Sequence, residues 1–429
     1  MLAVIEQRQA FSNRVLSEHL ERRPHWDARD RGLVTTLVYG VLRHRTRLDA
    51  QVDAHAKRPA GFKGEVRQLM RVGALELREL SHPIHAVLTE VGHAAARLQG
   101  GSGLRRAIHG VLAQVAEHGA ALDAKWEEAS ILDALDRRWS IPRWMAGRWR
   151  KQLGDDAALA RAKALALPPP IDVRLDLHRG DREELLRRLR EDHPTARIEE
   201  VEDLEGQPQA LRLHGAGDIF HGPLHGEGLL SVQGLAAQQP ARWLAPQPGE
   251  RVLDACAGLG VKSLQLAELM RREGSVIAAD LDPRHHDDHD DLAARGRLPE
   301  SFEHRYVVAD LTEDVAPLDE LPFDAVLLDV PCTGLGNLAR HPEIRWLRRY
   351  DDIAARAELQ RALLRRNATR VRAGGRLVYA VCSPEPEEGP SVVEAVVEEL
   401  DGWTVNAMRC FTPEDDRTEG FFVARLDHQ

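Results

Sequence analysis

From about residue 225 onward, short apolar runs alternate with segments that have helical periodicity. Such alternation is typical of a parallel β-sheet with helices on both faces. Two runs near the end of the chain, WTVNAM and GFFVARL, are close enough in sequence to pair antiparallel. The sequence therefore predicts an α/β domain with five parallel strands and a terminal reversed pair. The five expected parallel strands are RVLDACA, SVIAADL, HRYVVAD, FDAVLLDV and GRLVYAVCS.

The residues before this domain show two other patterns. Residues 1–140 have apolar residues at helical spacing in segments 10–20, 30–52, 66–80, 84–98 and 104–118, which predicts an all-α bundle. Beyond WSIPRW and the proline run of ALALPPP, alternation in IDVRLDL, ARIEEVE and ALRLHG predicts short strands, and DREELLRRLRED predicts a helix. We therefore expect a multidomain chain with a helical part (1–140), a small α+β linker module (141–224) and the α/β domain (225–429).

The charge of the chain is unevenly distributed. The formal net charge of -10 argues against a protein whose whole surface is basic, which is the simplest signature of nucleic-acid binding. However, residues 1–150 contain 24 Lys and Arg against 17 Asp and Glu, whereas the remainder contains 34 against 51. The basic first third could dock on RNA, or its charges could simply solvate helix faces.

Cysteine usage and hydropathy indicate the compartment. The four cysteines are scattered and include no CxxC pair, so neither a disulfide framework nor a zinc site is expected. No apolar stretch approaches the roughly 20 residues that span a bilayer, and the N-terminus lacks the order of a signal peptide. We expect a cytoplasmic protein with free thiols and no membrane association.

The turn after the first expected strand has the features of a cofactor loop. It reads DACAGLGVKS, in which Gly258 and Gly260 allow backbone amides to approach a ligand at a helix N-terminus. The second strand ends in Asp280, placed to accept hydrogen bonds from a ribose diol, and the third ends in Asp310, placed near an adenine amine. Each acidic residue taken singly is better explained as a solvated loop residue or helix cap. Together they favour a nucleoside-containing cofactor.

The next two strands end in cysteines. The fourth ends in DVPC, which places Asp329 and Cys332 at the same edge, and the fifth ends in Cys382. Buried cysteine is usually only a small apolar residue, but two thiols at adjacent strand ends above a cofactor cleft indicate covalent chemistry. Such chemistry suits a pyrimidine, because carbon 5 of cytosine becomes nucleophilic when a thiolate adds at carbon 6. Methyl transfer to carbon 5 can then follow.

In such a reaction the other groups at this edge would have distinct roles. Asp329 would hydrogen-bond N3 of the base and stabilise the charge that develops on addition. Cys332 is the candidate for assisting removal of the carbon 5 proton and release of the enzyme thiol. The base must also leave its stack to reach the pocket.

Three motifs carry a resemblance to a known family: FDAVLLDVPCTGLGNLARHPEIRW, GGRLVYAVCSPEPEEG and EGFFVARL. Over nearly the whole chain the sequence resembles the bacterial small-subunit ribosomal RNA cytosine-C5 methyltransferases, the group known as Sun, Fmu or RsmB. The resemblance implies a class I (Rossmann-like) methyltransferase domain that uses S-adenosyl-L-methionine. It also implies Cys382 as the nucleophile and Cys332 as the group that aids product release. DNA cytosine methyltransferases attack from the PC cysteine, so the two thiols favour RNA and not DNA.

The amino-terminal region looks like the NusB-type RNA-binding domain of this family, through DRGLVTTLVYGVLRHRTRLD, MRVGALELREL and RRAIHGVLAQV. This NusB-like part favours ribosomal RNA over transfer RNA as substrate. The resemblance implies cofactor contacts from the loop and from three strand ends. These residues are Cys256, Ala257, Gly258, Leu259, Gly260, Val261, Lys262, Asp280, Asp310 and Asp329.

Several segments depart from the family pattern. The loop is normally CAAPGGKT but here reads CAGLGVKS, the VQDxAAQ-like segment reads SVQGLAAQ, and TCS reads VCS. The run DPRHHDDHDD after the second strand raises the hypothesis of a metal site, because histidines and carboxylates ligate divalent metals. No ligand spacing stands out, so we predict a solvated, charged helix start and no metal.

Two alternatives to a ribosomal RNA methyltransferase stay open at this point. The altered loop would suit an RNA-binding protein that kept the fold and lost catalysis. The same chemistry could instead act on transfer RNA. Nothing in the sequence requires more than a monomer.

Overall fold

The computed structural model describes residues 1–98, 101–201 and 208–429, and the chain divides into two compact units. One unit contains residues 1–168 together with 338–348, and the other contains residues 169–337 and 349–429. Glu202, the last residue of the predicted strand 196–202, lies outside the described residues.

The first unit is helical, as predicted. The predicted segment 30–52 contains two helices because the chain turns at His44, whose amide caps the first helix by donating to the carbonyl of Gly40. Buried side chains of α3, α4, α5 and α7, including Val41, Leu48, Met70 and Leu112, form its main core. The helices are α1 (Leu2–Arg8), α2 (Ser12–Glu21), α3 (Ala28–Arg43), α4 (Arg45–His55), α5 (Gly64–Arg78), α6 (Ile84–Ala96), α7 (Gly101–Glu127), α8 (Ile131–Asp133), α9 (Arg143–Leu153), α10 (Asp155–Ala164) and α17 (Ile344–Leu347).

A segment from late in the sequence completes this helical unit. Arg345, in α17, is 1% exposed, and its guanidinium donates to the carbonyl oxygens of Arg43 at 2.8 Å, Ser140 at 3.4 Å and Leu165 at 3.0 Å. The indole Nε1 of Trp346 donates to the carbonyl of Leu42 at 3.1 Å. Residues 338–348 therefore belong to the helical unit, and Pro342, Glu343, Ile344 and Arg345 are buried.

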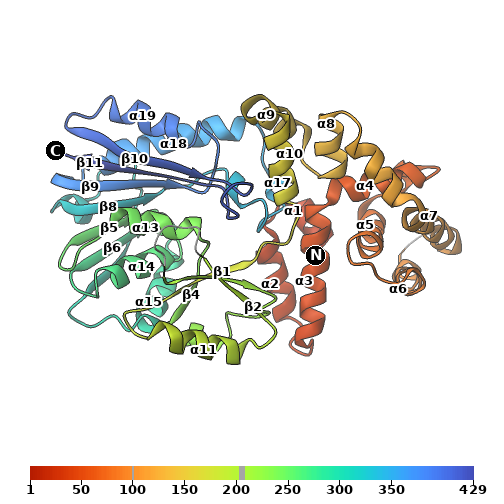
Figure 1. Cartoon of the computed structure of the whole chain (residues 1–429), viewed down its shortest axis with the longest axis horizontal. Helices are drawn as coiled ribbons and strands as arrows, with labels where there is room; N and C mark the ends of the chain where they lie inside the picture. Colours follow the sequence, from red (N-terminus) through yellow and green to blue (C-terminus); the bar gives the residue numbers. More distant parts are fainter. Residues whose placement is uncertain (99–100, 202–207) are drawn as a thin grey trace. The chain divides into compact units, whose positions relative to one another are not determined.

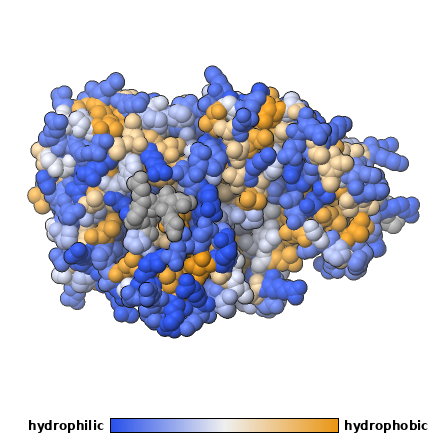
Figure 2. All heavy atoms as spheres, viewed as in Figure 1, coloured by the Kyte–Doolittle hydropathy of each residue, from blue (hydrophilic) through white to orange (hydrophobic). Residues whose placement is uncertain are grey.

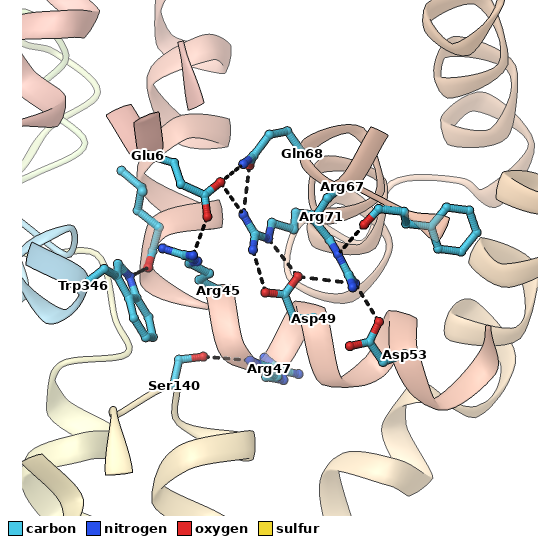
Figure 3. Close-up of polar contacts among 12 residues, drawn as sticks. Glu6, Arg45, Arg47, Asp49, Asp53, Arg67, Gln68, Arg71, Ser140 and Trp346 are labelled. Atoms are coloured by element: carbon cyan, nitrogen blue, oxygen red, sulfur yellow. Dashed lines mark hydrogen bonds and ion pairs between the residues drawn. The ribbon is translucent and has the colours of Figure 1, made fainter. Parts of the chain in front are cut away.

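Polar contacts tie α1, α4 and α5 together beside this segment (Figure 3). Arg71 of α5 binds Asp49 of α4 with two hydrogen bonds of 2.8 and 2.6 Å, and Arg45 of α4 binds Glu6 of α1. The guanidinium of Arg45 also lies over the ring of Trp346, 5.1 Å from its centroid. These contacts satisfy arginines that the helical packing takes partly out of water.

The second unit begins with the small α+β module that the sequence predicts. Its four-stranded antiparallel sheet has the order β2-β3-β1-β4. The strand β4 was not predicted; it pairs with β1, with Val232 opposite Val173. The elements are β1 (Ile171–Leu175), α11 (Arg182–Asp192), β2 (Arg197–Glu200), β3 (Ala210–His214), α12 (Pro223–Gly226) and β4 (Leu230–Val232).

A seven-stranded sheet of order β10-β11-β9-β8-β5-β6-β7 follows. The strands β9, β8, β5, β6 and β7 are parallel, whereas β11 pairs antiparallel with both β9 and β10. Both the five parallel strands and the reversed pair are confirmed. The elements are α13 (Gln239–Leu244), β5 (Arg251–Ala255), α14 (Val261–Leu269), β6 (Ser275–Asp280), α15 (His285–Arg295), β7 (Glu303–Val308), α16 (Ala316–Asp319), β8 (Phe323–Asp329), α18 (Asp351–Ala368), β9 (Val371–Val381), α19 (Pro390–Val397), β10 (Trp403–Phe411) and β11 (Phe421–His428).

Helices cover both faces of this sheet (Figure 1). Buried residues of α18 and α19, such as Leu364 and Val393, pack on one face, and residues of α13 and α14, such as Leu244 and Leu266, pack on the other. Because parallel strands buried on both faces end at one common edge, the residues after β5, β6, β7 and β8 are brought together there.

The surface is mixed in character. On the face shown in Figure 2, hydrophilic side chains predominate and apolar side chains occur in separate patches. Among the described residues, no helix is both long and apolar enough to cross a membrane.

Candidate active site

The turn between β5 and α14 is built for close approach of a ligand. Gly258 and Gly260 have φ angles of 53° and 79°, in the left-handed region that favours glycine. A Cβ at Gly260 would lie 2.6 Å from a ring carbon of His289. The amide of Gly258 donates to the carboxylate of Asp280 at 3.0 Å, which fixes the turn to the end of β6.

A cavity of about 400 Å³ opens at the carboxyl edge of the parallel strands. Of the ten predicted cofactor residues, Cys256, Asp280, Asp310 and Asp329 line it. Apolar side chains and Arg356 of α18 form other parts of the wall. The size and the mixture of apolar walls with a few polar groups are those of a small-molecule site.

The other predicted loop residues lie outside the wall of this cavity. Ala257, Gly258, Leu259, Gly260, Val261 and Lys262 form the turn and the start of α14 and do not line the cavity. The side chain of Leu259 is 56% exposed. Lys262 donates from Nζ to Oδ2 of Asp329 at 2.5 Å, and so it joins the cofactor loop to the end of β8.

The charge of the Lys262–Asp329 pair is well stabilised. Burial alone would lower the pKa of the Lys262 ammonium, but the nearby carboxylate of Asp329 outweighs burial and the pKa is raised. The lysine therefore keeps a positive charge in the middle of the site.

The two cysteines predicted at adjacent strand ends are in contact. The Sγ atoms of Cys332 and Cys382 lie 2.9 Å apart, because β8 and β9 are paired with Asp329 opposite Ala380. The amide of Gly334 donates to the sulfur of Cys332 at 3.2 Å. The contact with Cys382 and burial raise the pKa of the Cys332 thiol well above its usual value.

The third cysteine of the region, Cys256, lies among carboxylates. Burial, followed by the charges of Asp280, Asp329 and Asp254, raises the pKa of the Cys256 thiol well above its usual value. A thiol surrounded by carboxylates is poorly suited to be a nucleophile. It contributes to the cavity wall instead.

The His and Asp run differs from the prediction at one residue. At the start of α15, His286 is exposed, as expected, and His285 is partly exposed, but His289 is fully buried. Its Nε2 lies 3.1 Å from the carbonyl of Gly258, and its ring stacks on His304 with centroids 5.4 Å apart. The prediction of a solvated segment is wrong for His289, because one turn of α15 packs this ring against the cofactor loop. Among the described residues, no group of three or more His, Cys, Asp or Glu could hold a metal ion.

Three further residues near the site were missed. Asp254 is fully buried in β5, accepts a hydrogen bond of 2.6 Å from Ser263, and has a pKa raised to about 7, mainly by burial. An aspartate inside an otherwise apolar strand is a signal that could have identified it. Arg356 and Glu388 give no comparable signal, since each lies in a segment with several like residues.

The residues at this edge fit a nucleoside cofactor. Each oxygen of the Asp280 carboxylate accepts one backbone amide, from Gly258 or Asp282, which leaves further lone pairs for ribose hydroxyls. The glycine turn leaves room for a ligand against its backbone. A doubly wound sheet with this turn and these strand-end carboxylates defines a class I S-adenosylmethionine-dependent methyltransferase.

Comparisons with known proteins identify the family. Residues 241–427 match the model for 16S rRNA methyltransferase RsmB/F, residues 1–117 match the NusB family, and residues 141–220 match the ferredoxin-like domain of RsmF/B-like methyltransferases. The chain belongs to this RsmB/F family of RNA methyltransferases, and S-adenosyl-L-methionine is its methyl donor.

The relatives and solved structures cover nearly the whole chain. It is 30% identical to "Probable ribosomal RNA small subunit methyltransferase B" of Synechocystis sp., with 99% of this chain and 97% of the relative aligned. It is also 30% identical to "Ribosomal RNA small subunit methyltransferase B" of Escherichia coli, covering 99% and 95%. The crystal structure of PH0851 has the same fold, with a TM-score of 0.80, 23% identity and coverage of 99% and 96%. A methyltransferase homolog from Pyrococcus horikoshii has a TM-score of 0.60 and 25% identity, covering 70% of this chain and 100% of that one.

Proposed function

We propose that this protein methylates carbon 5 of a cytosine in small-subunit ribosomal RNA, with Cys382 as the covalent nucleophile. The observation that carries the proposal is the contact of two thiols, 2.9 Å apart, at strand ends next to the cofactor cavity. The names of the relatives support small-subunit ribosomal RNA as the substrate over transfer RNA.

The proposed reaction begins with addition to the base. The thiolate of Cys382 forms a bond to carbon 6 of the flipped cytosine, and the displaced electron pair moves to N3. N3 takes a proton from the Lys262–Asp329 pair, whose two side chains are 2.5 Å apart. The base is then an enamine, with a nucleophilic carbon 5 that the methyl donor can alkylate.

Release of the product requires two proton movements. Cys332 takes the proton from carbon 5 and gives its own thiol proton to the departing sulfur of Cys382, while N3 returns its proton to the Lys262–Asp329 pair. The carbon–sulfur bond breaks and 5-methylcytosine remains. The short distance between the sulfurs suits this direct transfer.

Cysteine variants test the roles. Cys382→Ala should abolish methyl transfer, whereas Cys332→Ala should accumulate a covalent RNA adduct that survives denaturing electrophoresis. Cys410→Ala is the matched control, because Cys410 is an exposed cysteine of β10. Full turnover by Cys382→Ala would exclude the proposed nucleophile.

Bisulfite sequencing of RNA from cells with and without the gene tests the substrate. We expect one or more cytosines of small-subunit ribosomal RNA to lose the modification when the gene is absent. Loss confined to transfer RNA would contradict the proposal.

The alternative of a non-catalytic RNA-binding protein rests on the altered cofactor loop. Against it stand the thiol pair, Lys262 and the three strand-end carboxylates, which lie at one edge of the sheet. Calorimetry with S-adenosylmethionine separates the two: an enzyme should bind at micromolar concentrations or below, and a non-catalytic protein should show no binding.

Further proposals concern the setting of the enzyme. We propose that it acts as a monomer in the cytoplasm and does not modify DNA, in keeping with a ribosomal RNA substrate. The three-part division at residues 140 and 224 also stays a proposal. The family matches each fall inside one predicted part, whereas α9 and α10 group with the helical unit and β4 completes the small sheet beyond residue 224.

A further inference from the structure

A buried carboxylate that the proposed reaction does not use lies next to the thiol pair. Glu388, between β9 and α19, is fully buried, and its Oε1 accepts from the amide of Thr333 at 2.8 Å and from Gln360 Nε2 at 3.1 Å. Its Oε2 accepts from the hydroxyl of Ser383 at 2.6 Å and from the hydroxyl of Thr333. In the described part of the chain, no Lys, Arg or His forms an ion pair with Glu388. A buried charge held only by neutral donors costs stability, so its retention calls for an explanation.

The partners of Glu388 occupy special positions. Thr333 directly follows Cys332, and Ser383 directly follows Cys382. One carboxylate therefore connects the residues next to both thiols, across two loops that are 50 residues apart in sequence. Gln360 also donates to the carbonyl of Pro331 at 3.1 Å, on the other side of Cys332. Together these bonds fix the backbone on which the two sulfurs are carried.

The charges around the thiol pair are asymmetric. The negative charge of Glu388 acts on Cys332, whereas the positive charge of Lys262 interacts with Cys382. Other titratable groups close by include Asp329, Tyr379, Arg361 and the buried Glu385. Tyr379 donates its hydroxyl to the backbone carbonyl of Glu388 at 2.6 Å. This arrangement favours the neutral thiol on Cys332 and places a positive charge beside Cys382.

We infer that Glu388 is a positioning residue for the thiol pair: it holds the two sulfurs at proton-transfer distance and keeps Cys332 as the neutral thiol while Cys382 becomes the thiolate. The inference rests on the proposed roles of the two cysteines. It assigns a use to the acidic segment PEPEEG that follows the nucleophile. The rise in the Cys332 pKa that the Cys382 contact, burial and the Glu388 charge produce agrees with it.

Glu388→Gln separates charge from position. The amide oxygen can keep accepting from the amide of Thr333 and from Gln360, and the new NH₂ group can donate to the hydroxyls of Thr333 and Ser383. The hydrogen bonds therefore remain and only the charge is lost. We expect the pH profile for alkylation of Cys332 by iodoacetamide, followed by peptide mass mapping, to move to lower pH by about one unit. The preference of the reagent for Cys382 over Cys332 at neutral pH should fall about tenfold.

Ser383→Ala removes one hydrogen bond to Glu388 and keeps the charge of its carboxylate. We expect kcat for methyl transfer to fall several-fold, with KM for S-adenosylmethionine unchanged and little change in the alkylation profile of Cys332. Glu358→Gln, at a side chain of α18 that is 77% exposed, is the matched control and should change neither property.

Alkylation profiles that coincide for Glu388→Gln and the unchanged protein, at equal melting temperatures, would overturn the electrostatic role. An unchanged kcat in Ser383→Ala would overturn the positioning role, and this variant is informative even if Glu388→Gln does not fold. Alkylation requires no RNA, so failure here is distinct from failure of the proposed function, which would appear as turnover by Cys382→Ala.

Discussion

Replacing His289 by alanine tests how the cofactor loop is held in its left-handed turns. The ring is fully buried, contacts the carbonyl of Gly258 at 3.1 Å and occupies the space next to Gly260. Loss of one such hydrogen bond costs about 1 kcal/mol, and the cavity left by the ring lowers the free energy of unfolding by about 2 kcal/mol more. Since the loop carries Cys256, which lines the cavity, and binds the cavity-lining Asp280 through the amide of Gly258, we expect S-adenosylmethionine to bind about fivefold to tenfold more weakly.

Isothermal titration calorimetry on the full chain measures the affinity, and thermal unfolding measures the stability. His286→Ala is the matched control, because this residue of the same helix has a side chain that is 58% exposed. We expect the control to change neither value. A His289→Ala protein with a lower melting temperature and unchanged affinity would refute the reasoning, since the ring would then support α15 without supporting the loop.

Three further predictions concern acid stability, a buried arginine and the thiol pair. Burial, with a smaller contribution from His289, lowers the pKa of His304 to about 4. Because the unfolded chain then binds a proton at this histidine more readily than the folded chain does, the free energy of unfolding falls as the pH drops from about 6.5 towards 4. The free energy of unfolding lost at pH 5.5 is about 1.4 kcal/mol. The melting temperature of His304→Gln should therefore fall less steeply with decreasing pH than that of the unchanged protein, and equal slopes for the two proteins would contradict this. Arg345→Met leaves three backbone carbonyls without their donor and should lower the free energy of unfolding by about 3 kcal/mol in urea titrations, whereas a change below about 1 kcal/mol would show that the guanidinium is dispensable. A diazene oxidant such as diamide should take two hydrogens from Cys332 and Cys382 and join them in a disulfide, which stops methyl transfer until dithiothreitol restores it; inhibition that dithiothreitol does not reverse would contradict this.

Much of the α/β domain could be predicted because its strands are short apolar runs that end in chemically distinct residues. The parallel order requires that the ends of β5, β6, β7 and β8 share an edge, so Asp280 and Asp329 could be assigned to one site from sequence alone. The adjacency of Cys332 and Cys382 was predicted on the same grounds, and the structure shows their sulfurs in contact.

Other features depend on tertiary packing that a sequence does not display. Glu385, Glu387 and Glu388 look alike in the segment PEPEEG, yet only packing decides which of them meets Thr333 and Ser383. In the same way, His289 differs from its neighbours only by its angle around α15. Local patterns identify an element and its exposed side, but they do not identify a single polar residue that the fold takes inside.

The position of residues 338–348 in the helical unit has a consequence for biosynthesis. Domains at the amino terminus usually fold while the rest of the chain is still being made. Here the carbonyls of Arg43, Ser140 and Leu165 receive their donor only when Arg345 has left the ribosome. The helical unit therefore cannot complete its folding until the small α+β module and most of the parallel strands have been synthesised, because its last stabilising segment follows them in the chain.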